Sequence, residues 1–389
     1  MTDQQADTQT SSNNKSQQRK KGLSIFILLL LLISLGSAAY WYLFIKGFEE
    51  TEDAYVSGNQ VMVSAQVAGN ISKINVDNMD PVLAGDVLLE LDDTNAKLSF
   101  EQAKSNLANA VRQVSQLNYT VKQLKSAIRA NEITLAQAQG NLNRRVQLVK
   151  DGAIDKESFQ HAKEAVELAK ANLTTSQNQL GANQALLLDG PLSEQPQIQS
   201  AVSNLKQAWL NLERTKIRSP IKGYVARRNA QVGQAVSVGG ALMAVVTTDQ
   251  MWLDANFKET QLTHMRIGQP AEIHFDLYGK DKTFDGKVVG IEMGTGSAFS
   301  LLPAQNATGN WIKVVQRVPV RIQLDPQQLA ENPLRIGLSA TVKVNVSDSQ
   351  GETLRDQAPA TTLYSTNVLQ YDESAVNNLI ESIIRDNSY

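Results

Sequence analysis

The chain has 389 residues, a formal net charge of −2 at pH 7 and no cysteine. The missing cysteines exclude disulfides, zinc ribbons and thiol catalysis, and the balanced charge, without a basic stripe that carries aromatic residues, argues against nucleic-acid binding. The length leaves room for about two to four domains.

A polar tail and a long apolar run open the sequence. Residues 1–22 are rich in Gln, Ser, Asn and Thr, a composition that predicts a disordered tail. Residues 23–45 carry no formal charge, and a helix of that length would extend about 34 Å, enough to cross a bilayer. A basic cluster, Arg19, Lys20 and Lys21, lies directly before this predicted transmembrane helix. By the positive-inside rule they place the tail in the cytoplasm and the bulk of the chain across the membrane.

A cleaved signal peptide is the alternative interpretation of the same run. Ser37-Ala38-Ala39 is an acceptable cleavage site. The apolar run continues past it, however, and aromatic residues gather at the far end of the run. Both features favour an uncleaved anchor, because aromatic side chains accumulate at membrane interfaces.

Short alternating strands, separated by Gly and Asp turns, occupy residues 46–66, 67–93 and 217–249. The last two segments echo each other, since each opens with a Gly before a strand and has a second Gly turn before an apolar strand. Neither segment has enough strands to bury a sheet alone. We therefore expect the two halves to meet in one β domain.

Residues 94–216, between the two halves, carry the pattern of a long helical hairpin. Apolar residues alternate at spacings of three and four, which is typical of a coiled-coil seam. The main series in the first arm is Leu107, Val114, Val121, Ile128, Leu135, Leu142 and Val149. A matching seam follows the turn, so we predict an antiparallel coiled coil whose arms are about 80 Å long.

Three local features interrupt or modify the regular seam of this predicted hairpin. The tip is expected at residues 150–155, where Gly152 suits a helix stop and Asp155 suits a new N-cap. Pro191 cannot continue a helix, so the second arm should be interrupted over residues 189–197. The polar seam residues Asn131 and Arg145 either fix the register or are simply solvated.

Residues 250–347 read as β structure, with a small barrel and a membrane-proximal β domain that also uses residues 49–66. The expected strands are Met251–Phe257, Ala271–Phe275, Phe284–Met293, Lys313–Leu324 and Ser339–Val346. Residues 348–389 form a polar tail that ends in a short amphipathic helix. Its apolar residues are Val376, Leu379, Ile380, Ile383 and Ile384. This helix packs on the protein or, alternatively, touches the membrane or a partner.

No catalytic, cofactor-binding or metal-binding constellation is present in the sequence. His264 and His274 lack metal-ligand spacing and are interpreted as ordinary histidines. Gly294-Thr295-Gly296-Ser297 is not followed by the Gly-Lys-Ser/Thr of a phosphate loop. Asp92 and Asp93 lie where a strand passes into the long helix, so Asp93 or Thr94 is interpreted as an N-cap.

The order of these segments resembles the HlyD family of membrane fusion (periplasmic adaptor) proteins. The split β module resembles a lipoyl/biotinyl domain cut at its hairpin, and residues 254–261 resemble the opening of the family's barrel. Residues 293–311 closely resemble the family's EmrA-type multidrug-efflux branch. The implied fold is elongated and mixed α and β: a transmembrane helix, a long α-helical hairpin inserted in a split lipoyl-like domain, and a β-barrel.

The resemblance implies a non-enzymatic adaptor, without cofactor, in the inner membrane of a Gram-negative bacterium. Its implied partners are an inner-membrane major-facilitator drug transporter, a TolC-like outer-membrane channel and further copies of itself. Related adaptors carry Arg, Leu and Ser at the hairpin tip for channel docking, and Arg144, Leu148 and Asp155 occupy those spacings here. The third residue is Asp instead of Ser, so Asp155 is alternatively only an N-cap.

Other functions compatible with the pattern are an adaptor for aromatic-acid, peptide or type I protein secretion, a carrier component of an acyl- or carboxyl-transfer enzyme, and a structural coiled-coil membrane protein. The carrier alternative is disfavoured because the turn that would present a modifiable Lys is replaced by the whole coiled coil.

Overall fold

A computed structural model describes residues 23, 26–37, 47–279, 281–296, 298, 315–355 and 362–388. The chain divides into two compact units. Unit 1 combines Met1–Val61 with Val246–Ser365, and unit 2 combines Met62–Val245 with Thr366–Tyr389.

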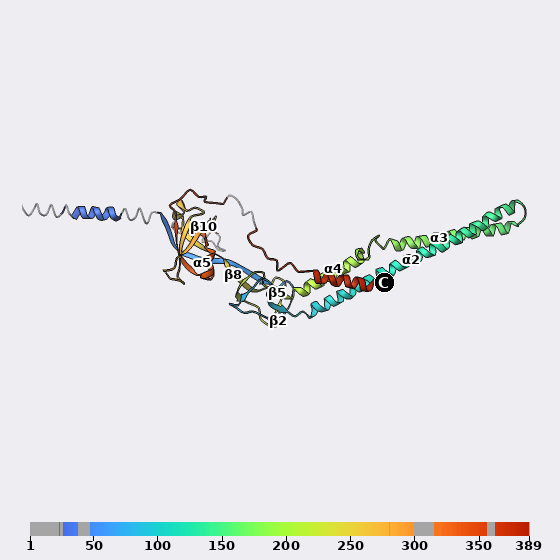
Figure 1. Ribbon diagram of the computed structural model, residues 1–389, viewed down its shortest axis with the longest axis horizontal. Helices are drawn as coiled ribbons and strands as arrows, with labels where there is room; N and C mark the ends of the chain where they lie inside the picture. Colours follow the sequence, from blue (N-terminus) through green and yellow to red (C-terminus); the bar gives the residue numbers. More distant parts are fainter. Residues whose placement is uncertain are drawn as a thin grey trace, which may run out of the picture. The chain divides into compact units, whose positions relative to one another are not determined.

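Unit 2 contains the predicted long hairpin, which is confirmed (Figure 1). Its first arm is α2 (Thr94–Lys150). The second arm comprises α3 (Lys156–Gln184), the short 3₁₀ helix η2 (Leu192–Glu194) and α4 (Pro196–Glu213). With 57 residues, α2 extends about 85 Å.

The seam of the hairpin is most tightly packed at its base. There Leu107, Val114, Ile198 and Leu205 are buried in one apolar cluster. Toward the tip the seam residues of α2, such as Leu135 and Leu142, are only half-buried. This gradient fits a two-helix rod that has neighbours on few sides.

The polar seam positions pair across the hairpin. Asn131 Nδ2 donates to Ser176 Oγ at 2.9 Å, and Arg145 Nη1 donates to the Ser158 carbonyl at 2.8 Å. Each bond joins the two arms at one register, so these residues do more than face solvent.

The β halves on either side of the hairpin do meet. A four-stranded sheet has the order β5-β4-β2-β7. It joins β2 (Gly69–Ile74) and β4 (Val87–Leu91) to β5 (Lys216–Arg218) and β7 (Ala235–Val236). The short strand β3 (Pro81–Val82) likewise pairs with β6 (Gly223–Arg228). The shared core includes Ile71, Leu88, Leu89, Ile217, Val225 and Met243.

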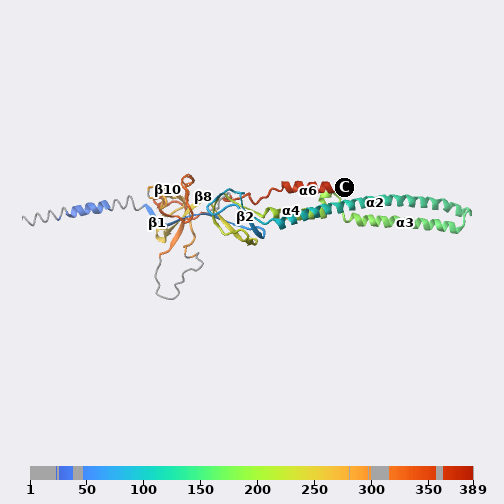
Figure 2. The same ribbon diagram turned by 90° about the horizontal axis from the view of Figure 1, so that it is seen from below.

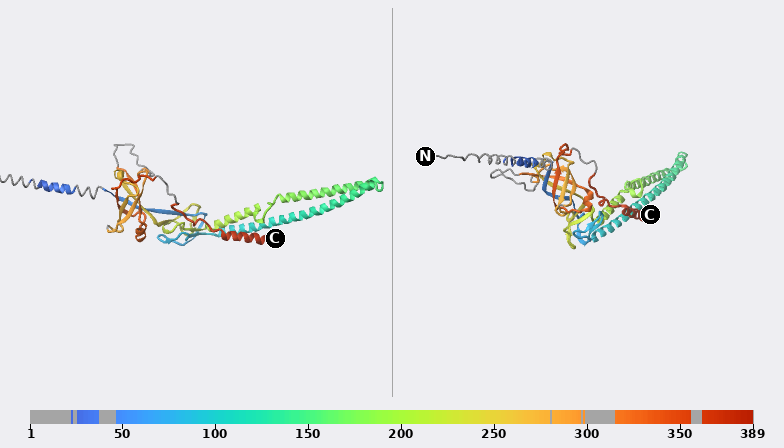
Figure 3. Two further views of the ribbon diagram at one scale, coloured as in Figure 1. Left: turned by 45° about the horizontal axis from the view of Figure 1, so that its top comes forward. Right: turned by 60° about the vertical axis from the view of Figure 1, so that its left-hand side comes forward.

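The strands of unit 1 close into a barrel (Figure 3). They are β1 (Phe48–Ser64), β8 (Ala241–Lys258), β9 (Pro270–Phe275), β10 (Phe284–Ile291), β11 (Arg317–Leu324) and β12 (Ser339–Asn345), and the first two continue beyond unit 1. The ring order is β1-β12-β9-β10-β11-β8, and β8 pairs again with β1. The 3₁₀ helix η3 (Glu259–His264) and α5 (Pro326–Glu331) complete the unit.

We expected a barrel and a second β domain, whereas the structure combines these strands in one barrel. The reason is the core. Inward side chains from β8, β9 and β10, including Phe257, Phe275 and Phe284, are fully buried only when β1 and β12 close the ring. The Phe275 and Phe284 rings meet edge to face, with centroids 4.9 Å apart.

Helix α6 (Ser374–Asn387) is the predicted amphipathic C-terminal helix. It lies along the base of the hairpin and packs on α2 and α4 (Figure 2). Val376 and Ile380 are buried there beside Val111. The first alternative for this helix, packing on the protein, is therefore confirmed.

The predicted membrane anchor is only partly described. Residues 26–37 are helical, and their leucines are exposed. Within the described parts of the chain, no helix is long and apolar enough to span a bilayer. The basic residues Arg19, Lys20 and Lys21 lie outside the described residues, as does most of the 293–311 segment.

Candidate docking surface at the hairpin tip

The hairpin tip is a tight turn set by backbone conformation. Helix α2 ends at Lys150, and Gly152 adopts a φ of +66° that favours glycine. The Ala153 N–H donates to the Leu148 carbonyl at 2.8 Å and so satisfies one of the last carbonyls of the helix. Helix α3 then begins at Lys156, after an extended Asp155. The predicted helix stop and restart are therefore where the sequence indicates.

Arg144 and Leu148 lie on one face of α2, because residues four apart are neighbours on a helix. Both are exposed, and the Leu148 side chain is 42% accessible. The Arg144 guanidinium donates to Asn141 Oδ1. It makes no ion pair within the described residues, so its charge remains available to another molecule.

Asp155 stands at the N-cap position of α3, as predicted. The side chain of Ser158 lowers the pKa of Asp155 below its ordinary value, and His161 adds a smaller attraction. The carboxylate is consequently charged at neutral pH. Its negative charge follows the turn along the chain, whereas Arg144 precedes it.

Arg145 is the tip residue whose role the seam pattern left open. Its bond to the Ser158 carbonyl crosses from α2 to the first turn of α3. The sequence feature that indicates this contact is the heptad seam position of Arg145, from which a long cationic side chain reaches the backbone of the facing arm. Arg145 therefore holds the turn closed, while its neighbour Arg144 points to solvent.

The other sequence candidates have structural roles. Asp93 is the N-cap residue of α2, and Asp92 accepts bonds from the Thr94 N–H and hydroxyl at 3.0 and 2.6 Å. His274 Nε2 lies 3.1 Å from the Thr283 hydroxyl. Among the residues that the structure describes, no group of His, Cys, Asp and Glu could hold a metal ion.

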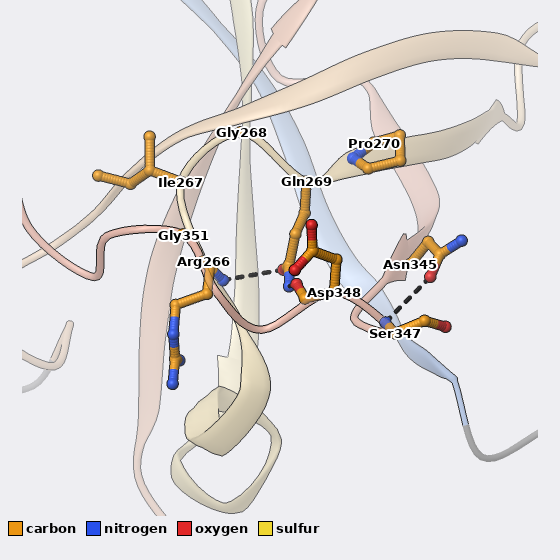
Figure 4. A pocket seen from close by; sticks show the side chains of 9 residues that line it. All are labelled: Arg266, Ile267, Gly268, Gln269, Pro270, Asn345, Ser347, Asp348 and Gly351. Carbon is orange, nitrogen blue, oxygen red and sulfur yellow. Dashed lines mark hydrogen bonds between the residues drawn. The ribbon is translucent and has the colours of Figure 1, made fainter.

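A pocket of about 320 Å³ opens on the barrel where β9 begins (Figure 4). Its buried polar residue is Gln269, whose amide donates to the carbonyls of His264 and Asp348 at 2.8 and 2.7 Å. Gln269 Oε1 of the same side chain accepts from the Arg266 backbone N–H at 2.8 Å. These bonds tie the loop after β12 to the turn before β9, and they leave the Gln269 side chain satisfied.

Two family models match the chain. The EMRA alpha-helical hairpin domain matches residues 94–215, and the AAEA-like beta-barrel domain matches residues 250–345. The "Multidrug export protein EmrA" of Haemophilus influenzae is 77% identical over 357 residues, which are 92% of this chain and 92% of that protein. The chain belongs to the EmrA family.

Other family members are also similar over most of their length. EmrA of Escherichia coli is 51% identical over 349 residues, or 90% of each chain. The "Fatty acid resistance protein FarA" of Neisseria gonorrhoeae is 52% identical over 299 residues, 77% of this chain and 76% of that protein. The resemblance drawn from the sequence to the EmrA-type branch is thus confirmed.

Proposed function

We propose that the chain is the adaptor subunit of a tripartite multidrug efflux pump. The observation that carries this function is the 77% identity, over 92% of both chains, to a multidrug export protein. The subunit has no enzymatic activity of its own. It connects an inner-membrane major-facilitator transporter to a TolC-like outer-membrane channel, and several copies surround the conduit.

The proposed topology follows from the N-terminal sequence. Residues 23–45 anchor the chain in the inner membrane, residues 1–22 remain in the cytoplasm, and the β domains and hairpin lie in the periplasm. The charge asymmetry around the apolar run supports this orientation. Hydrophobic drugs are the proposed cargo, and the 52% identity to a fatty acid resistance protein extends the range to fatty acids.

The β module beside the hairpin is, in this proposal, a lipoyl-like domain that no longer carries a cofactor. Its strands come from both sides of the hairpin. The chain leaves β4 into α2 and returns from α4 into β5, so the hairpin occupies the place of a turn. The module therefore serves as the mount of the hairpin.

We further propose that the tip docks on the channel through Arg144, Leu148 and Asp155. A guanidinium makes paired bonds to carboxylates, an exposed leucine fills an apolar groove, and a carboxylate accepts hydrogen bonds. The exposed Arg144–Leu148 face and the charged Asp155 supply these groups. Arg145 positions the turn that presents them.

The first prediction concerns Arg144 in living cells. A strain of the source bacterium lacking this gene should become sensitive to hydrophobic drugs and uncouplers. Plasmid-borne wild type should restore growth, whereas Arg144→Glu should not, because a reversed charge repels the acidic partner group that Arg144 would bind. The measurement is the minimal inhibitory concentration at equal protein level in the membrane.

Arg129→Glu is the matched control. Arg129 is exposed on the same helix, about 22 Å from Arg144 toward the base, and its reversal should leave resistance intact. If both variants restore growth, the adaptor function stands and the tip site is wrong. If wild type changes susceptibility to no compound, multidrug efflux is wrong and a secretion adaptor becomes the better function.

A further inference from the structure

A crevice of about 550 Å³ lies in unit 2, between α4 and the segment that leads into α6. Helix α4 contributes Lys206, Trp209 and Leu210, and Arg214 lies at its C-terminal end. Leu369 and Tyr371 line the opposite wall. The crevice thus joins two parts of the sequence that are far apart, and the tip site does not involve it.

The charges in this crevice do not cancel. Lys206 Nζ forms an ion pair with Glu373 Oε2 at 2.7 Å. Arg214 has no ion pair within the described residues, and its Nε is buried without a hydrogen-bond partner. Because the other cation is already paired, Arg214 leaves the crevice with one uncompensated positive charge.

The walls around this charge combine polar side chains, Ser203, Gln207 and Gln370, with apolar and aromatic ones. Trp209 and Tyr371 meet edge to face, with ring centroids 6.3 Å apart. Leu210 is half-buried, and Leu369 is 55% exposed. A guanidinium beside aromatic and aliphatic surface suits a ligand that has an anionic head and an apolar body.

We propose that this crevice binds an organic carboxylate with an apolar body. The carboxylate pairs with the Arg214 guanidinium, and the body lies against Trp209, Tyr371 and Leu369. Such a ligand contacts both α4 and the segment before α6, so its binding also fastens the C-terminal segment to the hairpin. This proposal does not depend on the proposed transport function. Ligand binding is measured on the purified chain, without a transporter or an outer-membrane channel.

The test uses the full chain in detergent and isothermal titration calorimetry, with phenylbutyrate as probe. Phenylbutanol supplies the same body without the charge, and acetate supplies the charge without the body. Phenylbutyrate should bind at least about tenfold more tightly than either, since a charged hydrogen bond and apolar burial both contribute. Arg214→Gln should weaken phenylbutyrate binding about tenfold relative to wild type. The affinity of Arg214→Lys should lie between those of wild type and Arg214→Gln.

Arg129→Gln is the matched control, because Arg129 is an exposed arginine on α2 outside the crevice. This variant should bind phenylbutyrate with the same affinity as wild type. Thermal unfolding of each variant establishes that it is folded. Arg214 also stands at the C-terminal end of α4, where a cation favours the helix dipole. If that is its whole role, Arg214→Gln lowers stability but binds phenylbutyrate as wild type. That result, equal binding of phenylbutanol or acetate, or no binding to wild type would overturn the proposal.

Discussion

Gly286 in β10 shows how one residue constrains the barrel. A Cβ added at this position would lie 2.7 Å from Ile273 Cδ1 and 2.7 Å from Ile322 Cγ2. Both isoleucines are fully buried in a packed core, so neither can move without displacing its neighbours. The absence of a side chain at position 286 is therefore a packing requirement.

We predict that Gly286→Ala lowers the free energy of unfolding of unit 1 by about 1–3 kcal/mol through overpacking. Gly290→Ala is the matched control in the same strand, because an added Cβ there meets nothing within 4 Å. Hydrogen exchange of the amides in β9, β10 and β11 measures the difference. Equal protection in the two variants would show that the core accommodates the extra methyl group.

At the scale of the elements, the break between α3 and α4 is built around Gln195. This side chain is only 3% exposed. Its amide accepts from the Leu188 N–H and donates to the Leu188 carbonyl, both at 2.9 Å. Pro196 then opens α4 at its first turn, where its missing N–H costs nothing. The interruption is thus a defined joint with its backbone groups satisfied.

Gln195→Ala should leave both Leu188 backbone groups without partners and destabilise the joint by about 1–3 kcal/mol. The expected result is faster hydrogen exchange at the Leu188 amide. Gln199→Ala is the control, because the exposed Gln199 makes a single bond to the Ser193 carbonyl at 2.7 Å. Should the two variants exchange alike, Gln195 would not be what fixes the joint.

At the scale of the whole chain, unit 2 is assembled from segments far apart in sequence. The end of the chain returns to the hairpin through Thr366, whose hydroxyl donates to the Pro220 carbonyl at 2.6 Å, and then through α6. Arg112 Nη1 donates to Asn387 Oδ1 at 2.6 Å near the end of that helix. The hairpin base is consequently a three-helix bundle instead of a pair.

We predict that Ile380→Asp detaches α6, because a charge would replace a side chain that is buried against α2. A free helix of this length is marginal in water, so amides 374–387 should lose their protection from exchange. Asn378→Asp, on the exposed face, should leave protection unchanged. Retained protection in Ile380→Asp would mean that other contacts suffice to hold α6.

The sequence alone predicts most elements but few of their partners. Heptad spacing locates both arms of the hairpin, and alternation locates the late strands, because these periods are local. That Ile273 and Ile322 both press on Gly286 depends on which strands are neighbours in the barrel. Which strands are adjacent is determined by closure of the barrel, and no local sequence pattern predicts it.

For the candidate site at the hairpin tip, the sequence likewise predicts some features and not others. Spacing alone places Arg144 and Leu148 on one face, and Gly152 marks the turn. The division of roles between Arg144, which is exposed, and Arg145, which bonds across the turn, depends on the facing arm. The bond between Gln195 and Leu188 escapes prediction because a buried amide has no sequence signature distinct from an exposed one.

The pairing of β8 with β1 has a consequence for how copies of this protein associate. A sheet that closes on itself offers no unpaired backbone N–H and C=O groups along an edge strand, and such groups are what recruits a strand from another chain. Each strand of the ring already has a neighbour on both sides. Within the described residues, this ring therefore offers no template for strand exchange or fibrous aggregation between copies of the chain, and any contact between two barrels must be made by side chains.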